Sequence, residues 1–422
     1  MSQDIQVTTL SNGLRVVTAP MPGTEIAATG VWVGVGSRYE TKEENGITHF
    51  LEHMFLKGTK TRKSREVWHA IESQGGEMNA ETGHEDTAFY IKVLKPHLPQ
   101  GFNVIADMLR NSTFPQKGLE KEQSVIIVEI KDDMDSASAF LSDRFMRKCF
   151  FGQPLGRPIL GTLESIRTFS RRDLFDYKER HYTPERMVVS AAGAVEHNQI
   201  VDLAHAAYGD MKRAPQIILP LPARYTGGDV RIERDMQQLE ICTLFKAVAK
   251  THADTPVYEV LTKILGGGRS TPLFQKIRAD LGLVYDASPV YDSYVDAGVF
   301  GVSAGLSPRN MPKYLDTLTK VLQTGASNVT EQTLQEAKNA IKGEATFSLE
   351  GAAERAEWAA QCVLHEGKVP SIDEHLTRTN GVTRADLKRV LAEMLSSKPT
   401  LAVIGKIRHL ENYDSFAARF AL

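Results

Sequence analysis

The sequence predicts a protein of two similar halves, each built from both β-strands and α-helices, on three observations. The 422 residues are enough for roughly two to three domains of about 150 residues each. Hydrophobic patterns typical of strands and helices follow a similar order in both halves, although the residue-level similarity between the halves is faint. Three prolines within residues 215–222 are typical of an interdomain linker. We therefore expect an N-terminal domain at residues 1–212, a linker at 213–228 and a C-terminal domain at 229–422.

The first half begins with a predicted β-hairpin. Asn12-Gly13 separates two apolar runs, residues 6–10 and 14–18, and Asn-Gly in this position is a strong turn signal. Valine at every second position of residues 31–35 predicts a buried strand. Gly75-Gly76 ends a predicted helix. The helices of this half are expected at residues 65–74, 96–110, 119–133, 171–181 and 198–211, and its later strands at 87–94 and 187–192.

The second half contains strand and helix patterns in a similar order. Its strands are expected at residues 240–245, 284–290, 299–304 and 400–404, and its helices at 256–265, 311–324, 331–344, 352–364 and 384–395. A further short helix is predicted through Phe274 and Ile277. The glycine-rich stretch 266–270 lacks the Gly-Lys-Ser/Thr ending of a phosphate-binding loop, so we interpret it as a hinge that stops a helix.

The composition is that of an ordinary globular protein. Apolar residues make up 42% and charged residues 24% of the chain, and the formal net charge is -2. No block of lysine or arginine stands out, so neither nucleic acid nor an anionic membrane is expected as a partner. No apolar run approaches the ~18 residues that cross a bilayer, and the polar start lacks the features of a signal peptide. Three widely separated cysteines fit a reducing compartment, so we expect a cytoplasmic location.

A candidate metal site lies in residues 46–57, for which we predict a helix. His49 and His53 are four residues apart and therefore lie on one face of that helix. Two imidazoles with this spacing can hold one Zn²⁺ at roughly 2.0–2.1 Å, and the carboxylate of Glu52 on the same patch can accept a proton from water. His-x-x-Glu-His is the inverted order of a common zinc-protease signature. The alternative is an amphipathic helix whose histidines make only structural contacts.

A third protein ligand is expected on the helix predicted at residues 119–133. Glu122 and Glu129 are two turns apart on one face, and the apolar run 125–128 between them predicts that the helix is largely buried. A buried carboxylate is costly unless it is paired, hydrogen-bonded or bound to a metal. Taken alone, the pattern favours salt bridges at the edge of an apolar face. Beside the histidine pair, however, a zinc ion needs one more protein ligand, and Glu129 is the natural candidate, with Glu122 behind it.

The metal motif and several longer stretches resemble the M16 (pitrilysin-type) zinc metallopeptidases. Glu129 follows His53 by 76 positions, as this resemblance requires. The other similar stretches are residues 10–16, 34–40, 154–162, 265–268, 273–275 and 278–285, so that the resemblance extends over nearly the whole chain. The size and motif order are similar to single-chain bacterial members related to the mitochondrial processing peptidase β subunit. The resemblance implies an α+β fold of two similar domains, each an antiparallel β-sheet with helices packed on one face.

The resemblance also implies how the metal site would work. His49, His53 and Glu129 would ligate one Zn²⁺ per chain. Glu52 would be the general base, and Glu122 would support the site from behind the metal ligands.

The substrate-binding residues are likewise implied by the resemblance. Asn79 and Ala80 would lie on an edge strand that binds the substrate as an added β-strand. Arg278 and Tyr285, seven positions apart, would hold the substrate backbone and carbonyl from the opposite domain. One departure concerns substrate preference: Glu81 stands where relatives often have an aromatic residue.

The expected function is therefore that of a zinc-dependent endopeptidase. It would hydrolyse extended peptides inside a closed chamber formed by a homodimer, in which Arg278 and Tyr285 of one chain act at the metal site of the other. Two alternatives stay open. The chain could be a subunit of a targeting-sequence processing peptidase that works with a different chain, or a non-catalytic peptide-binding relative.

Overall fold

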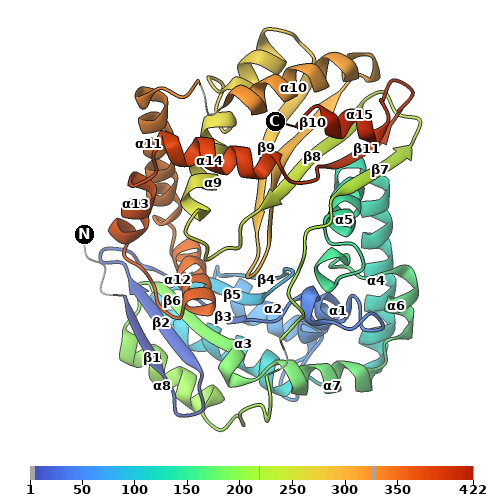
Figure 1. Ribbon diagram of the computed structural model, residues 1–422. Coiled ribbons are helices and arrows are strands. Elements are labelled where there is room, and N and C mark those ends of the chain that lie inside the picture. The colour runs from blue at the N-terminus through green and yellow to red at the C-terminus, as the bar shows by residue number, and fades with distance from the viewer. Residues whose placement is uncertain (1–4, 218, 326–327, 422) are drawn as a thin grey trace. The chain divides into compact units, whose positions relative to one another are not determined.

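The computed structural model describes residues 5–217, 219–325 and 328–421, which divide into two units (Figure 1). The first unit contains the residues up to Asp132, Arg157–Pro220 and Thr346–Ser371. The second unit contains Asp133–Gly156, Leu221–Ala345 and the residues from Ile372 onward.

The first unit is built on a six-stranded sheet in the order β1-β2-β6-β3-β5-β4. Its strands are β1 (Gln6–Thr9), β2 (Arg15–Pro20), β3 (Ile26–Val33), β4 (Glu77–Thr82), β5 (Thr87–Leu94) and β6 (Met187–Gly193). Neighbouring strands are antiparallel except β2 and β6, which are parallel. The predicted hairpin is confirmed as β1 and β2, with Gly13 at a φ of 92° in the turn. Because β4 is an edge strand, one side of its backbone has no partner strand in this sheet.

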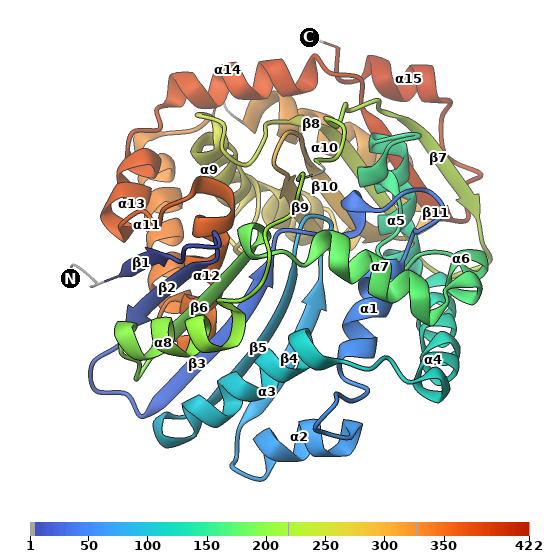
Figure 2. The ribbon, with the colours of Figure 1, turned by 90° about the horizontal axis from the view of Figure 1, so that it is seen from below.

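Helices cover both faces of this sheet. One face packs against a core to which seven helices contribute: α1 (Ile47–Phe55), α2 (Ser64–Glu72), α3 (Leu98–Asn111), α4 (Gln116–Asp135), α6 (Leu163–Thr168), α7 (Arg171–His181) and α8 (His197–Tyr208). In Figure 2, α3 and α8 run along this face. The opposite face is covered by α12 (Ala352–Glu366), whose small side chains Ala356 and Ala359 let it lie against Trp32.

The two cores explain the continuous apolar runs in the central strands. Successive residues of a strand point to opposite faces of the sheet. In β6, Val188 belongs to the core under α12, whereas Val189 belongs to the core on the other face. Both positions are therefore apolar, and the strand shows no polar alternation.

The second unit is built on a five-stranded sheet in the order β7-β11-β8-β10-β9. Its strands are β7 (Gly228–Glu233), β8 (Leu239–Ala247), β9 (Val284–Ser293), β10 (Gly298–Leu306) and β11 (Thr400–Gly405). All pairs are antiparallel except β7 and β11. Its helices are α5 (Ala137–Cys149), α9 (Thr255–Leu265), α10 (Met311–Gly325), α11 (Glu331–Ser348), α13 (Ile372–Asn380), α14 (Arg384–Leu395) and α15 (Tyr413–Ala418), with a π-helical turn at Leu273–Ala279. Helix α5 packs Leu141 and Phe145 against Leu244 and Ile404 on one face of the sheet.

The expected architecture of two units, each with a β-sheet and helices, is confirmed, but the helices are divided between the units differently from the sequence-based expectation. We expected helices on one face of each sheet and a division between residues 212 and 229. Instead, each sheet has a helix on its second face, and that helix comes from the other half of the sequence: α12 in the first unit and α5 in the second. The physical reason is that strands apolar on both faces need a cover on both faces. Both sheets are also mixed rather than purely antiparallel, because each contains one parallel pair.

The structure also bears on two features of the composition, the apolar runs and the cysteines. Within the described ranges, every helix is too short or too polar to cross a membrane. Cys149 and Cys242 are buried, and burial raises the pKa of the Cys149 thiol to about 12.

Candidate metal centre

Helix α1 presents both histidines on one half-buried face. Phe50 and Met54 are fully buried and anchor the helix in the core of the first unit. The side chains of His49 and His53 retain 13% and 18% of their exposure, and their ring centroids lie 4.6 Å apart. The spacing of four residues therefore places the two rings one turn apart, as the sequence predicts.

Helix α4 brings Glu129 to the two histidines. Glu129 Oε2 lies 3.9 Å from His49 Nε2 and 3.7 Å from His53 Nε2. One possible ligand atom of each residue lies within 4.8 Å of the other two. The Glu129 side chain is 39% exposed, so the cluster can be reached from solvent on this side.

The burial of α4 differs from the sequence-based expectation. We predicted that this helix is largely buried, but its buried residues form one stripe of Leu119, Glu122, Ile126 and Ile130. Val128 is 55% exposed, so the prediction of general burial was wrong. An α-helix has 3.6 residues per turn, so four consecutive apolar residues point in all directions around it and only some of them face the core.

The three donor atoms suit a zinc ion. In a tetrahedral site with bonds of about 2.0–2.1 Å, neighbouring donor atoms lie roughly 3.4 Å apart. The separations of 3.7 Å and 3.9 Å from Glu129 Oε2 to the two Nε2 atoms are close to this value and too long for hydrogen bonds. Two imidazoles and one carboxylate are a donor set of catalytic zinc sites, which leave a fourth position open.

The surroundings of the two histidines shift their pKa values in opposite directions. Burial, assisted by the neighbouring His53, lowers the pKa of His49 to about 3, so its ring is neutral at neutral pH and can donate a lone pair. Burial also disfavours the charged form of His53, but the hydrogen bond with Glu122 and the charges of Glu129 and Glu52 outweigh it and raise its pKa. A metal ion at Nε2 of His53 would therefore compete with a proton.

Glu122 holds His53 from behind. Its side chain is only 2% exposed, its Oε2 lies 3.0 Å from His53 Nδ1, and its Oε1 lies 2.8 Å from Lys57 Nζ. Burial acts to raise the pKa of Glu122, but the hydrogen bonds from His53 and Lys57 lower it overall, so the carboxylate is ionised. Because an ionised carboxylate only accepts hydrogen bonds, Nδ1 of His53 is the donor, and in the neutral ring Nε2 has the lone pair that a metal needs.

Glu52 lies between the two histidines in the sequence and is also buried. It is 8% exposed, and its Oε2 accepts a hydrogen bond of 2.5 Å from Thr82 Oγ1, at the end of β4. Burial raises the pKa of Glu52, although the Thr82 hydrogen bond and the nearby His53 oppose the rise. A carboxylate with a raised pKa is a stronger base, which suits a residue that accepts a proton.

The predicted substrate residues Asn79 and Ala80 lie on the edge strand β4. The backbone N–H of Ala80 donates to Asn79 Oδ1 at 3.0 Å, which indicates that this N–H faces the open edge rather than β5. Asn79 Nδ2 donates to the Tyr90 hydroxyl at 3.1 Å. A cavity of about 240 Å³ lies beside the strand, and its lining includes Asn79, Tyr90 and, from α12, Glu357.

Arg278 and Tyr285 belong to the second unit, whereas the metal cluster belongs to the first. Arg278 lies in the π-helical turn with its guanidinium 5.0 Å from the centre of the Phe274 ring. Tyr285 is 74% exposed on the edge strand β9. It sits at a β-bulge, because Val284 pairs with Leu306 and Asp286 with Gly305, which leaves Tyr285 without an opposite residue.

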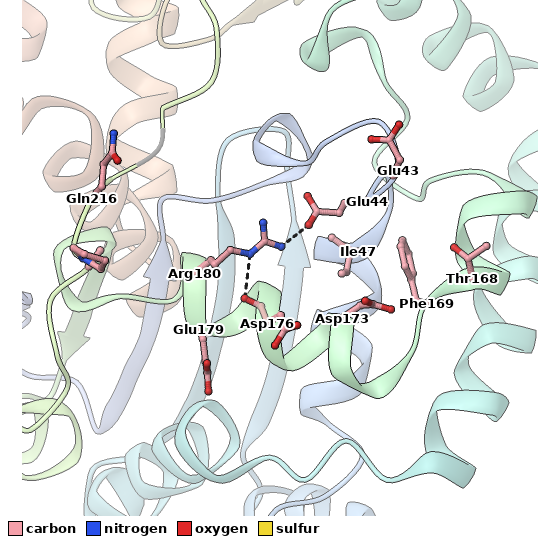
Figure 3. Close-up of a pocket in the computed structure, with 12 residues that line it drawn as sticks. Glu43, Glu44, Ile47, Thr168, Phe169, Asp173, Asp176, Glu179, Arg180 and Gln216 are labelled. Carbon is pink, nitrogen blue, oxygen red and sulfur yellow. Dashed lines mark hydrogen bonds and ion pairs between the residues drawn. The ribbon is translucent and has the colours of Figure 1, made fainter.

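A larger cavity, of about 950 Å³, lies at the N-terminal end of α1 (Figure 3). Its lining carries the carboxylates of Glu43, Glu44, Asp173, Asp176 and Glu179. Figure 3 shows the guanidinium of Arg180, from α7, between the carboxylate of Glu44 and the backbone of its own helix. The residues of the metal cluster do not line this cavity.

Sequence reasoning missed two partners of the site, Lys57 and Thr82. Lys57 lies just beyond the end of α1 and pairs with Glu122 of α4, so the helical period of α1 does not identify it. Thr82 contacts Glu52 only because β4 pairs into the sheet, and no local sequence pattern predicts that contact.

Both halves of the chain match known families. A family described as insulinase (peptidase family M16) matches residues 15–163, and one described as peptidase M16 inactive domain matches residues 168–341. The chain is 33% identical over 407 residues to a Rickettsia bellii protein named uncharacterized zinc protease, with 96% of this chain and 98% of that protein covered. It is 31% identical over 430 residues to an Arabidopsis thaliana protein named probable mitochondrial-processing peptidase subunit beta, with 99% and 81% covered.

The fold has a close counterpart among solved structures. The crystal structure of a protease from Helicobacter pylori superposes with a TM-score of 0.89, at 22% identity, over 96% of this chain and 99% of that one. With a sequence relative at 33% identity over almost its full length and family matches in both halves, this chain belongs to the M16 peptidase family.

Proposed function

We propose that this protein is a zinc-dependent endopeptidase that binds one Zn²⁺ per chain and cleaves peptides in an extended conformation. The observation that carries this function is the convergence of His49, His53 and Glu129, with Glu52 on the same helix as the histidines. Relatives of this chain are named zinc proteases, which agrees with that donor set.

The side chains of the first unit supply the parts of a peptide hydrolysis. Bound zinc would polarise the scissile carbonyl and lower the pKa of the attacking water toward ~7. Glu52 accepts the proton of that water and later returns it to the leaving amine nitrogen. Thr82 holds the Glu52 carboxylate through its hydroxyl, and Glu122 holds His53 in the tautomer that a metal requires.

The substrate binds as an additional strand on β4. An edge strand presents unpaired N–H and C=O groups to which an extended peptide can add. The N–H of Ala80 would exchange its bond with Asn79 Oδ1 for one with the substrate backbone. Main-chain pairing of this kind favours flexible peptides over folded proteins.

An unstructured, internally quenched peptide tests this function. The zinc-loaded protein should cleave it, and Ala80→Pro, which removes the N–H, should raise KM by roughly 2–10-fold, the value of one hydrogen bond. Ala80→Val is the matched control, because it adds similar bulk but keeps the N–H, so its KM should stay near that of wild type. No cleavage by zinc-loaded protein would overturn the function, and an unchanged KM in Ala80→Pro would overturn the role of β4.

The active species in this proposal is a homodimer. Arg278 and Tyr285 would act on substrate held at the metal site of the other chain, with the Tyr285 hydroxyl stabilising the oxyanion that forms at the scissile carbonyl. The 74% exposure of Tyr285 and its place at a bulge leave its hydroxyl available to a ligand.

Mixing two inactive variants tests the exchange between chains. Glu52→Gln and Tyr285→Phe proteins should each be impaired, and an equal mixture allowed to exchange subunits should recover about a quarter of wild-type activity. The reason is that half of the dimers are mixed and each of these has one intact site. The fraction of mixed dimers is measured by native mass spectrometry. Mixed dimers without recovered activity would show that both residues act within one chain.

A second candidate function is that of a subunit in a targeting-sequence processing peptidase. The relative from Arabidopsis thaliana, named as a probable mitochondrial-processing peptidase subunit beta, favours this reading. The two functions differ in self-sufficiency, because such a subunit would need a different chain, whereas the endopeptidase cleaves alone. A non-catalytic peptide-binding role is disfavoured, because this chain keeps Glu52 and all three predicted ligands.

A further inference from the structure

The N-terminus of α1 cannot be capped by its own N-cap residue. The first N–H groups of a helix have no partner within the helix and are usually satisfied by a polar side chain at the N-cap. Here the N-cap is Gly46, at a φ of 95°. A Cβ at this position would lie 2.7 Å from Gly161 Cα and 2.8 Å from the Leu160 carbonyl oxygen. The close packing of the loop that contains Gly161 therefore excludes a serine or aspartate cap.

The carboxylate of Glu40, six residues earlier in the chain, takes the place of that cap. Its Oε2 accepts hydrogen bonds from the Gly46 N–H at 2.8 Å and from Asn45 Nδ2 at 3.0 Å. Its Oε1 accepts from the Thr48 N–H at 2.9 Å. A negative charge at this end of a helix is also stabilised by the helix dipole.

Glu40 is itself held firmly. It is 3% exposed, and its backbone carbonyl accepts a hydrogen bond of 2.7 Å from Arg157 Nη1. The turn that it caps is also held from the other side, because the hydroxyls of Thr48 and Tyr177 lie 2.7 Å apart in a hydrogen bond. The first turn of α1 is therefore fixed by buried groups from separate parts of the first unit.

The turn that Glu40 fixes is the one that carries the first metal ligand. Thr48, whose N–H bonds to Glu40, immediately precedes His49 in the chain. Partners that orient a metal ligand contribute to metal affinity without touching the metal. We propose that Glu40 is a positioning residue of the metal site, which holds the first turn of α1 so that His49 stays aimed at the metal. This inference rests on the proposed zinc function.

Zinc affinity, measured by competition with a chromophoric chelator on the full-length protein, tests the role of Glu40. Glu40→Gln keeps the volume but loses the charge and one acceptor, and we expect it to weaken zinc binding about tenfold or more. Glu43→Gln is the control, because Glu43 is an exposed acid of the same loop, and its zinc affinity should match wild type. Burial raises the pKa of Glu40 to about 7, so the titration is run above neutral pH, where the carboxylate is ionised.

Amide hydrogen exchange on the wild-type protein gives a second test, which needs no substitution and is therefore unaffected by misfolding of a variant. Coupling between two sites is reciprocal, so if the capped first turn of α1 favours zinc binding, zinc binding also favours the capped turn. Zinc should therefore slow hydrogen exchange at the amides of Gly46 and Thr48, which Glu40 caps. Unchanged exchange at both amides, or wild-type zinc affinity in Glu40→Gln, would overturn the role of Glu40. Failure of wild-type protein to bind zinc at all would instead overturn the proposed function, so the two failures are distinguishable.

Discussion

Replacing Glu52 with glutamine should lower kcat by roughly 10²–10⁴-fold while the protein still binds zinc, since general acid–base catalysis contributes that much. Glutamine has nearly the same shape and can still accept the hydrogen bond from Thr82, but it cannot take a proton from water. The measurements are peptide cleavage under saturating substrate and the zinc content of the purified protein.

Two comparisons make the Glu52→Gln result specific. Glu72→Gln changes an exposed glutamate at the end of α2 and should leave kcat unchanged. The KM of Glu52→Gln should stay near that of wild type, because the edge strand β4 is intact. Substantial cleavage by Glu52→Gln would mean that another group accepts the proton.

Removing the carboxylate of Glu129 should abolish both zinc binding and activity. Glu129→Ala leaves only the two histidine nitrogens as protein ligands, one fewer than catalytic zinc sites use. Zinc that binds only the folded protein stabilises it by about 2.7 kcal/mol when the free ion is at a hundred times its Kd. Wild-type protein should therefore melt at a lower temperature after chelation, whereas Glu129→Ala should show no response to zinc or chelator.

Glu120→Gln provides the control on the same helix, because Glu120 is exposed and lies outside the metal cluster. It should bind zinc and respond to chelation like wild type. Zinc content near one per chain in Glu129→Ala, with unaltered affinity, would remove Glu129 from the ligand set and with it the proposed metal site.

The local part of the metal site was predictable from the sequence. The spacing of His49 and His53 is a property of any α-helix, because residues four apart share a face whatever surrounds them. The position of Glu52 within the same turn follows for the same reason. Glu129 was different, since its pattern alone favoured a salt bridge, and only the histidine pair and the family resemblance made it the predicted third ligand.

The supporting contacts were not predictable in this way. Thr82 meets Glu52 because β4 lies at the edge of the sheet beside α1, and Glu40 meets the first turn of α1 because a loop near Gly161 is packed against it. Each contact depends on the packing of segments that are distant in the sequence or joined by an irregular loop. No period of 2 or 3.6 residues encodes such packing.

The same distinction holds for the fold. Most strands and helices, the turn at Gly13 and the presence of two related halves could be predicted from local hydrophobic patterns and turn residues. The placement of α5 in the second unit and of α12 in the first could not be predicted in this way. The apolar face of a helix does not indicate which sheet the helix will cover. Periodicity depends only on neighbours along the chain, whereas the choice of partner depends on which apolar surfaces are left uncovered once both sheets have formed.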